Sequence, residues 1–152
     1  MAEEVAEIFS KHIFSSKYED LSEKTIKQLK VFLLDTIGVG IAGSTGSKLN
    51  ELKKIAHTWS KGKNCTVLGT WDRYSRDAST LINAYQIHCL EFDCIHEGAV
   101  VHPMAAILSS LLAHCEEINN LGHHTNGKEF LISLALGVDI ACLLYTSDAA
   151  DD

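Results

Sequence analysis

The densest group of side chains that can do chemistry lies between residues 88 and 102. It consists of His88, Glu91, Asp93, His96 and His102. His88 and Glu91 are three positions apart, so on a helix they would share one face. His102 stands directly before a predicted helix, and the positive end of the helix dipole favours a neutral imidazole there. A neutral imidazole can accept a proton near neutral pH, so the group is a candidate acid–base site.

Three interpretations of this group stay open on residue types and spacing alone. In the first, the side chains are helix caps and surface polar groups. In the second, they are ligands of a zinc or iron ion, although the sequence has no H-E-x-x-H motif. In the third, they carry out acid–base catalysis without a metal. Spacing in a single sequence does not decide among the three.

Helices are expected to position this group, because apolar residues recur at three- and four-residue steps along most of the chain. Asp20, at capping-box spacing from Glu23, and Ser22 are both suitable N-caps for the second helix. Residues 65–68 are too short to predict a strand, and residues 69–76 are expected to form a loop. Proline is scarce, which favours long helices. The sequence therefore predicts an all-α fold, with helices over about residues 3–14, 20–42, 48–60, 76–92, 103–117 and 130–141.

Small residues gather near the end of the second predicted helix, at Gly38, Gly40, Ala42 and Gly43. They predict that another backbone approaches closely there. The alternative is a frayed helix end, at which Gly43 would serve as the C-cap. The segments 104–117 and 130–141 are strongly apolar, and we expect their faces to be exposed because their partners would lie in later sequence.

Composition narrows the class of protein and its location. The formal net charge is −7 and lysines are spread singly, so no nucleic-acid partner is expected. No run approaches the roughly 20 apolar residues of a membrane span, so no membrane partner is expected. The acidic start lacks the basic region of a signal peptide, which makes a cytoplasmic location the expectation. The cysteines form no C-x-x-C pair, as is typical of reduced thiols.

The segment 142–152 differs in character from the rest of the chain. It resembles the translation of a transposon-derived sequencing adapter rather than natural protein sequence. We therefore expect residues 1–141 to be part of one helical domain, ending inside an apolar helix, and residues 142–152 to be a non-native tail. The alternative is a polar natural terminus.

The chemical cluster resembles a motif of the MmgE/PrpD family, which includes 2-methylcitrate dehydratase and cis-aconitate decarboxylase. Family members carry a stretch similar to L-[DE]-[FY]-D-D-x-H-x(4–5)-H-P, and here residues 90–103 read LEFDCIHEGAVVHP. Residues 30–43 resemble the family's early L-L-D-T-[LI]-G…A-G helix, and residues 130–140 resemble its A-x-x-x-G-[YV]-[ED]-[VI] helix. The resemblance covers nearly all of residues 20–141.

The resemblance implies an all-α main domain, a smaller α/β lid domain made by later sequence, a homodimer, and no metal or organic cofactor. It also implies a small di- or tricarboxylate substrate. The implied enzyme is a lyase, such as a 2-methylcitrate dehydratase-like hydro-lyase, or an isomerase that moves a proton beside a carboxylate. The alternatives are a metal-dependent hydrolase that uses the His/Glu/Asp cluster and a non-catalytic helical dimerisation module.

The resemblance also assigns residues to the catalytic site. Glu91 matches the family's first active-site carboxylate and His102 its active-site histidine. Asp93 matches the central acid of the motif and His96 the intervening histidine, and both are expected to support the site. The family's later histidine and its carboxylate-binding lysines come from sequence beyond Ala141. We therefore expect this segment alone to be inactive.

Three positions depart from the family's pattern. Cys94 replaces the second aspartate of the motif, and its expected role is that of a small buried thiol rather than a nucleophile. Ile95 stands where decarboxylase-like members have threonine, which argues against decarboxylation of cis-aconitate. Met104 replaces the glycine or serine common after His-Pro. These changes leave the substrate open.

Overall fold

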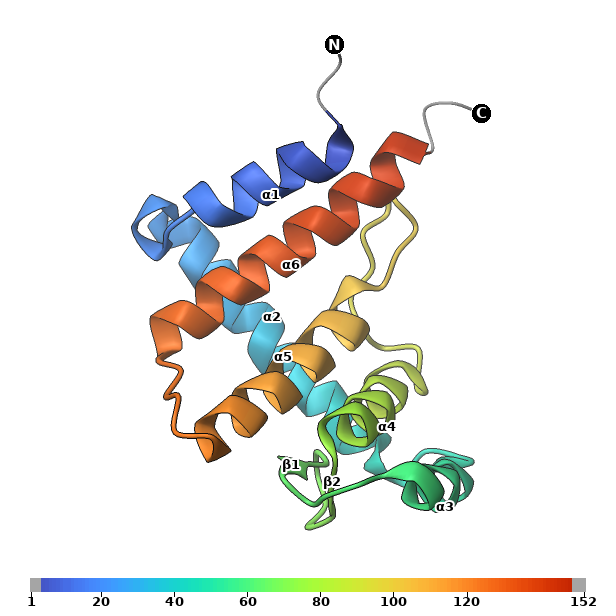
Figure 1. Cartoon of the computed structure of the whole chain (residues 1–152). Coiled ribbons are helices and arrows are strands. Elements are labelled where there is room, and N and C mark those ends of the chain that lie inside the picture. Colours follow the sequence, from blue (N-terminus) through green and yellow to red (C-terminus); the bar gives the residue numbers. More distant parts are fainter. Residues whose placement is uncertain (1–3, 149–152) are drawn as a thin grey trace.

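The computed structural model of the chain describes residues 4–148, which are mainly helical (Figure 1). The prediction of an all-α fold is confirmed. A short antiparallel hairpin joins β1 (Cys65–Thr66) to β2 (Arg73–Tyr74), so the segment predicted as a loop contains a strand. The helices are α1 (Val5–Ser15), α2 (Glu23–Ala42), α3 (Leu49–Trp59), α4 (Arg76–His88), α5 (Pro103–Asn120) and α6 (Gly127–Asp148), and the 3₁₀ turns are η1 (Tyr18–Asp20) and η2 (Gly43–Thr45).

Of the two possible N-caps of α2, the structure uses Ser22. Its side-chain oxygen accepts a hydrogen bond from Thr25 N at 3.1 Å, which satisfies one of the free N–H groups of the first turn. Asp20 instead closes η1, where its carboxylate accepts a hydrogen bond from Lys17 N at 2.8 Å. The capping box expected at Asp20 is therefore wrong, because this carboxylate is already occupied by the preceding turn.

The end of α4 also differs from the prediction, and this difference shapes the site. The helix ends at His88 rather than near Phe92. Cys89 is its C-cap and donates its N–H to Tyr85 O at 2.8 Å. Glu91 then has a φ of 55°, a left-handed conformation that a continuing right-handed helix does not allow. His88 and Glu91 therefore face each other across a turn rather than along one helix face.

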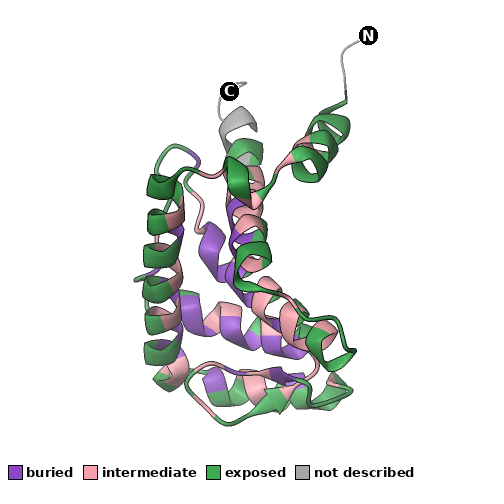
Figure 2. Ribbon diagram, turned by 90° about the vertical axis from the view of Figure 1, so that its left-hand side faces the viewer, coloured by how far each residue is buried: buried purple, intermediate pink, exposed green. Residues whose placement is uncertain are grey.

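The helices enclose two adjoining cores. In Figure 1, α2 crosses behind α5 and α6, and α5 packs against α4 as well as α6. Figure 2 shows buried residues where these helices face one another, while α1 has no buried residue. The core between α2, α5 and α6 contains Leu29, Met104, Leu108, Leu131, Leu134 and Ala135. The core between α3, α4 and the strand segment contains Leu49, Ala56, Val67, Ala78 and Ile82.

A buried polar face of α4 holds the segment around β1. Ser79 Oγ donates a hydrogen bond to Cys65 O at 2.9 Å. Asn83 donates through Nδ2 to Thr66 O and accepts from Leu68 N through Oδ1, both at 2.9 Å. Because buried polar groups are stable only when they are paired, these bonds fix the position of α4 along the strand segment.

The end of α4 also lies directly against the end of α2. Gln86 Nε2 donates to Gly40 O at 2.9 Å and to Leu68 O at 2.8 Å. A Cβ atom built on Gly43 would lie 1.9 Å from Gln86 O, so only glycine fits there. The close backbone approach that the small residues predicted is confirmed at Gly43. It does not extend to Gly38, where a Cβ atom would meet nothing within 4 Å.

The exposed apolar side chains do not lie where the sequence analysis expected them. Among the described side chains, no large apolar residue of segments 104–117 and 130–141 is exposed. This expectation was wrong, because α5 and α6 pack against each other and against α2. Strongly exposed large apolar side chains occur instead at Phe14, Leu34, Trp71, Phe92 and Val100.

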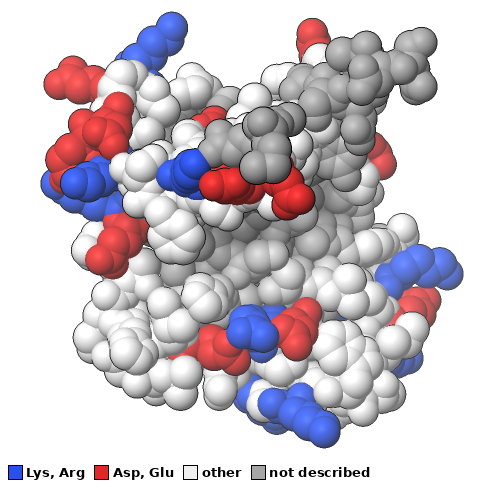
Figure 3. Space-filling view, turned by 45° about the horizontal axis from the view of Figure 1, so that its top comes forward, with Lys and Arg blue, Asp and Glu red and all other residues white. Residues whose placement is uncertain are grey.

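Two surface features bear on partners. No single helix within residues 4–148 is long and apolar enough to cross a membrane, although α2 with η2 and α3, which meet at 96°, together pass such a test on length and composition. On the face shown in Figure 3, acidic and basic side chains are interspersed and no broad basic area is formed. The absence of a nucleic-acid partner stays a prediction.

The proposed non-native tail overlaps α6. Residues 142–148 continue this helix, and residues 149–152 lie outside the described part of the chain. A helical conformation does not bear on the origin of the segment, so the division at residue 141 stays a prediction.

Candidate active site

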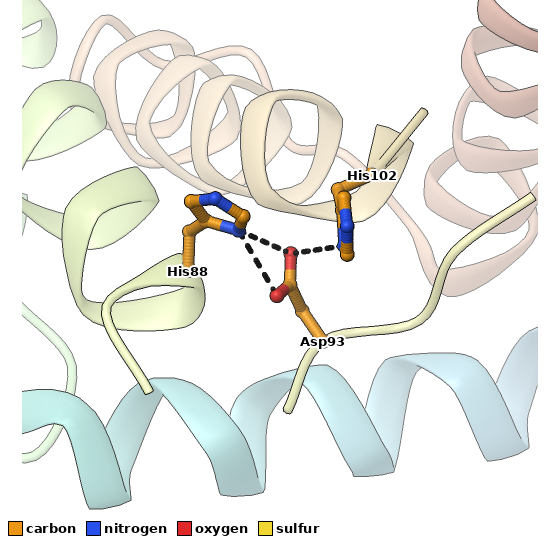
Figure 4. Close-up of side chains that lie close together, drawn as sticks. All are labelled: His88, Asp93 and His102. Atoms are coloured by element: carbon orange, nitrogen blue, oxygen red, sulfur yellow. Dashed lines mark hydrogen bonds and ion pairs between the residues drawn. The ribbon is translucent and has the colours of Figure 1, made fainter. Parts of the chain in front are cut away.

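Three side chains from separate elements meet around one carboxylate (Figure 4). His88 is the last residue of α4, Asp93 lies in the connection between α4 and α5, and His102 is the N-cap of α5. His88 Nδ1 lies 3.1 Å from Asp93 Oδ1 and 3.2 Å from Oδ2, and His102 Nδ1 lies 3.3 Å from Oδ2. The two imidazole rings contact each other edge-on, with centroids 5.0 Å apart. Asp93 therefore holds the two histidines as one group.

The Asp93 carboxylate is the buried member of this group. Its side chain is 0% exposed, whereas those of His88 and His102 are 46% and 29% exposed. An isolated carboxylate is costly to bury, and the two imidazoles reduce this cost, His88 through a hydrogen bond and His102 through its ring nitrogen 3.3 Å away. Asp93 is thus the fixed point of the group, and the imidazoles reach from it toward solvent.

The two histidines contact Asp93 differently. The contact of His88 has hydrogen-bond geometry, and an ionised carboxylate can only accept, so the proton of a neutral His88 lies on Nδ1. Its Nε2 is then free to accept a proton. His102 Nδ1 is at ion-pair distance from Asp93 Oδ2 but forms no hydrogen bond, and this buried nitrogen has no other hydrogen-bond partner. His102 is therefore positioned less rigidly than His88.

A cavity of about 700 Å³ opens beside the group, between α3, α4 and α5. Its polar lining includes His88, Glu91 and His102, and its apolar lining includes Leu52 and Leu81. Glu91 and His102 thus line the same hollow, although they are far apart along the chain. Among the described residues that line it, none is lysine or arginine. This surface can exchange protons with a bound molecule, but it supplies no cation for carboxylates.

Glu91 reaches the cavity because of its backbone conformation. The positive φ after the end of α4 turns the chain back, and Glu91 Oε1 lies 3.7 Å from His88 Nε2. Its side chain is 75% exposed, so it remains accessible to a molecule in the cavity. Non-glycine residues with positive φ are uncommon and are enriched at functional sites.

His96 does not join the group. Its Nδ1 accepts a hydrogen bond from Ala99 N at 3.1 Å, and its backbone pairs with Val101 in an isolated bridge. His96 is exposed and does not line the cavity. Its observed contacts organise the loop that leads to His102, and its supporting role in the site stays a prediction.

The two cysteines near the site are held as thiols. Burial raises the pKa of Cys94, and the negative charges of Asp93 and Asp35 raise it further. Burial also raises the pKa of Cys89, whose side chain lines the cavity. Since the thiolate is the nucleophilic form, neither cysteine is activated for attack. Cys94 is partly rather than fully buried, so the expectation of a buried thiol is met only in part.

His88 is the site residue that the catalytic assignment left out. The sequence analysis included it in the polar cluster but not among the catalytic candidates. A usable signal was its spacing, five positions before Asp93 in the same polar cluster, whereas its place at the end of a helix was not predicted. The contact between His88 and His102 could not be read from spacing, because it depends on how α4 packs against α5.

With this geometry in view, comparison with known proteins identifies the family. Residues 7–150 match the MmgE/PrpD N-terminal domain. The chain belongs to the MmgE/PrpD family. The resemblance stated from the sequence is therefore confirmed.

Similar proteins include decarboxylases of this family. The cis-aconitate decarboxylase-like protein oryM of Aspergillus oryzae is 28% identical over 87% of this chain and 29% of its own length. The cis-aconitate decarboxylases of Homo sapiens and Mus musculus are 27% and 26% identical over 100% of this chain, and over 32% and 31% of their own lengths. The chain thus spans about a third of the length of these relatives, and it is part of a lyase-like family.

Proposed function

We propose that this segment supplies the proton-transfer part of a lyase active site that acts on a small di- or tricarboxylate. The reaction would either remove a proton beside a carboxylate and expel water, or expel carbon dioxide and add a proton to the remaining carbon skeleton. The observation that carries this proposal is the convergence of His88 and His102 on the buried Asp93, beside a cavity that Glu91 also lines. Membership of a family with cis-aconitate decarboxylases supports the class of reaction.

In this proposal His102 is the base and Asp93 positions it. The Asp93 carboxylate lies 3.3 Å from His102 Nδ1, where it can orient the ring and stabilise an imidazolium that forms during the reaction. This arrangement suits a group that takes a proton from the substrate and then releases it. His88 shares the same carboxylate, so it restricts how Asp93 can move.

Glu91 is proposed as the second proton-transfer group. It lies on the cavity wall near His88, in a position to meet the leaving group while His102 meets the C–H bond. Elimination needs an acid and a base on different atoms of the substrate, and two titratable groups on one cavity wall satisfy this requirement. His96 keeps the supporting role of shaping the loop.

Recognition of the substrate requires additional residues. Cations bind carboxylates and stabilise the charge that develops in the transition state, and the described cavity lining contains no lysine or arginine. We therefore propose that later sequence of the family contributes the cations. Ile95, in place of the threonine of decarboxylase-like members, favours dehydration over decarboxylation of cis-aconitate. The homodimer also belongs to the proposal for the longer protein.

The test compares this chain with a longer protein in which the same segment is followed by the later part of a full-length family member. Both are assayed for loss of water from 2-methylcitrate and citrate and for release of carbon dioxide from cis-aconitate. The longer protein should turn over at least one of these substrates, and the chain alone none. His102→Ala in the longer protein should lower kcat by on the order of 10²-fold or more.

His57→Ala is the matched control, because His57 lies on α3 and does not line this cavity. This variant should keep its kcat. Equal loss in the two variants, or full activity of His102→Ala with an intact fold, would contradict the role of His102. Turnover by the chain alone would show that the cations from later sequence are not needed.

A further inference from the structure

We propose that His88, Asp93 and His102 also form a binding site for a transition-metal cation of the zinc class, and that the bound ion blocks proton transfer. One ring nitrogen from each histidine and a carboxylate oxygen lie within 4.8 Å of one another, and in both histidines the nitrogen next to the carboxylate is Nδ1. The binding part of this inference stands on these three side chains alone. The blocking part rests on the proposed function.

The separations between the donor atoms already suit a four-coordinate ion. Zinc–nitrogen and zinc–oxygen bonds of about 2.0–2.1 Å place neighbouring ligand atoms about 3.3–3.4 Å apart in a tetrahedron. The distances from Asp93 oxygens to His88 Nδ1 and His102 Nδ1 are 3.1–3.2 Å and 3.3 Å. The separation between an Asp93 oxygen and His88 Nδ1 thus matches one edge of such a tetrahedron, and the separation between an Asp93 oxygen and His102 Nδ1 matches a second edge. Any remaining approach is between the two histidine nitrogens, and His102, which forms no hydrogen bond with Asp93, can adjust.

The types of donor atom select the class of cation. Two imidazoles and one carboxylate suit zinc and similar transition metals, whereas calcium and magnesium prefer sites built from oxygen atoms. The carboxylate that would meet the ion is buried, so a cation there compensates its charge more fully than two neutral imidazoles do. His102 Nδ1 is a buried nitrogen that lacks a hydrogen-bond partner, and a metal bond would satisfy it.

The site also keeps a position for a fourth ligand. Zinc sites with three protein ligands usually complete their coordination with water or substrate. Here His88 and His102 both line the 700 Å³ cavity, from which water or a carboxylate can reach the ion. Cys89 lines the same cavity but is not among the grouped ligand atoms.

Metal binding would change which ring nitrogen carries the proton. A neutral imidazole that ligates through Nδ1 holds its proton on Nε2. His88, which without metal donates Nδ1–H to Asp93 and has a free Nε2, would become a donor on the cavity side. His102 would likewise lose a free nitrogen with which to accept a proton. The ion is thus an inhibitory ligand rather than a cofactor, because it occupies the groups that proton transfer requires.

The experiment measures Zn²⁺ binding to the chain as it stands, by competition with a chromophoric chelator, with Mg²⁺ as the comparison ion. One Zn²⁺ per chain should bind, and Mg²⁺ should not compete. Asp93→Asn, His88→Ala and His102→Ala should each weaken Zn²⁺ binding by at least roughly 10-fold. His123→Ala, an exposed histidine in the loop after α5, should leave it unchanged. Far-UV circular dichroism of each variant shows whether it has folded.

A second measurement uses the unaltered chain, so it does not depend on how variants fold. Long-range ¹H–¹⁵N spectra of the imidazoles should show Nδ1 ligation and an Nε2 proton at two histidines when Zn²⁺ is added. Ligation through Nε2, or a loss of affinity in His123→Ala as large as in Asp93→Asn, would overturn the proposal. Because binding is read without turnover, its failure leaves the proposed function standing, and absence of turnover leaves the metal site standing.

Discussion

Replacing Gly43 with alanine should force α2 away from the end of α4 and weaken the fold. A Cβ atom at this position would lie 1.9 Å from Gln86 O, 2.7 Å from its carbonyl carbon and 3.0 Å from its Cα atom. All three atoms belong to the backbone, so no rotation of a side chain can relieve the contact. The φ of Gly43 is −66°, which alanine adopts readily. The cost is therefore steric rather than conformational.

The magnitude follows from the missing space. A carbon and a carbonyl oxygen approach to about 3.3 Å at closest, so the two backbones must separate by more than about 1 Å. Overpacked cores typically lose 1–3 kcal/mol and occasionally more, and a clash between two backbones belongs at the upper end. We expect Gly43→Ala to lower the free energy of unfolding by about 3 kcal/mol. This is a large part of the 5–15 kcal/mol typical of a domain.

Two glycines within α2 provide matched controls for Gly43, which follows the end of this helix. At Gly38 a Cβ atom would meet nothing within 4 Å, so alanine should stabilise the helix by up to about 1 kcal/mol. At Gly40 the nearest atoms are Leu68 Cδ1 at 2.8 Å and Ile87 Cγ1 at 3.0 Å, and both belong to side chains that can adjust. The free energy of unfolding of Gly40→Ala should therefore lie between those of Gly38→Ala and Gly43→Ala.

The assay is urea unfolding of the chain followed by far-UV circular dichroism. With a typical slope of about 2 kcal/mol per molar urea, the midpoint of Gly43→Ala should fall by about 1.5 M. Because Gln86 precedes His88 by two positions, the displacement should also weaken Zn²⁺ binding at the proposed site. Equal stability of Gly43→Ala and Gly38→Ala would refute the close approach of α2 and α4.

Two further predictions concern the strand segment. Glu116→Ala should lower the free energy of unfolding, measured in urea, by about 1.5–3 kcal/mol. The reason is that Glu116 accepts hydrogen bonds from Thr66 N and from Thr66 Oγ1 at 2.6 Å. The control Glu117→Ala breaks an exposed pair with Arg76 and should lower it by at most about 1 kcal/mol, so equal losses in the two variants would contradict this prediction. Burial raises the pKa of Cys65, so folding favours the thiol: its contribution to stability is present below the ordinary thiol pKa and is lost as the pH rises through the folded one. Iodoacetamide should therefore modify Cys65 at pH 8 in urea but not in the folded chain, as read by peptide mass spectrometry, and equal rates would contradict its burial.

Much of the site could be found from the sequence because its residues are close together along the chain. Histidine and carboxylate side chains within one short segment can be brought together by a helix face or a turn, and the family motif pointed to Glu91 and His102. Their place on one cavity wall agrees with that prediction. Their catalytic roles stay predictions. The sequence could not show which residues contact Asp93, because His88 joins the group only through a turn after α4 and through the packing of α4 on α5.

The sequence by itself determined the helical class, most helix positions and the family, since these follow from apolar periodicity, caps and motifs that act over a few residues. Tertiary structure decided where α4 ends, which apolar faces are covered, and that Asp93 is buried between two imidazoles. Burial and contacts between elements depend on atoms from distant parts of the chain. The Asp93 carboxylate is buried because other helices exclude water from it, and the spacing of residues within one segment cannot predict that exclusion.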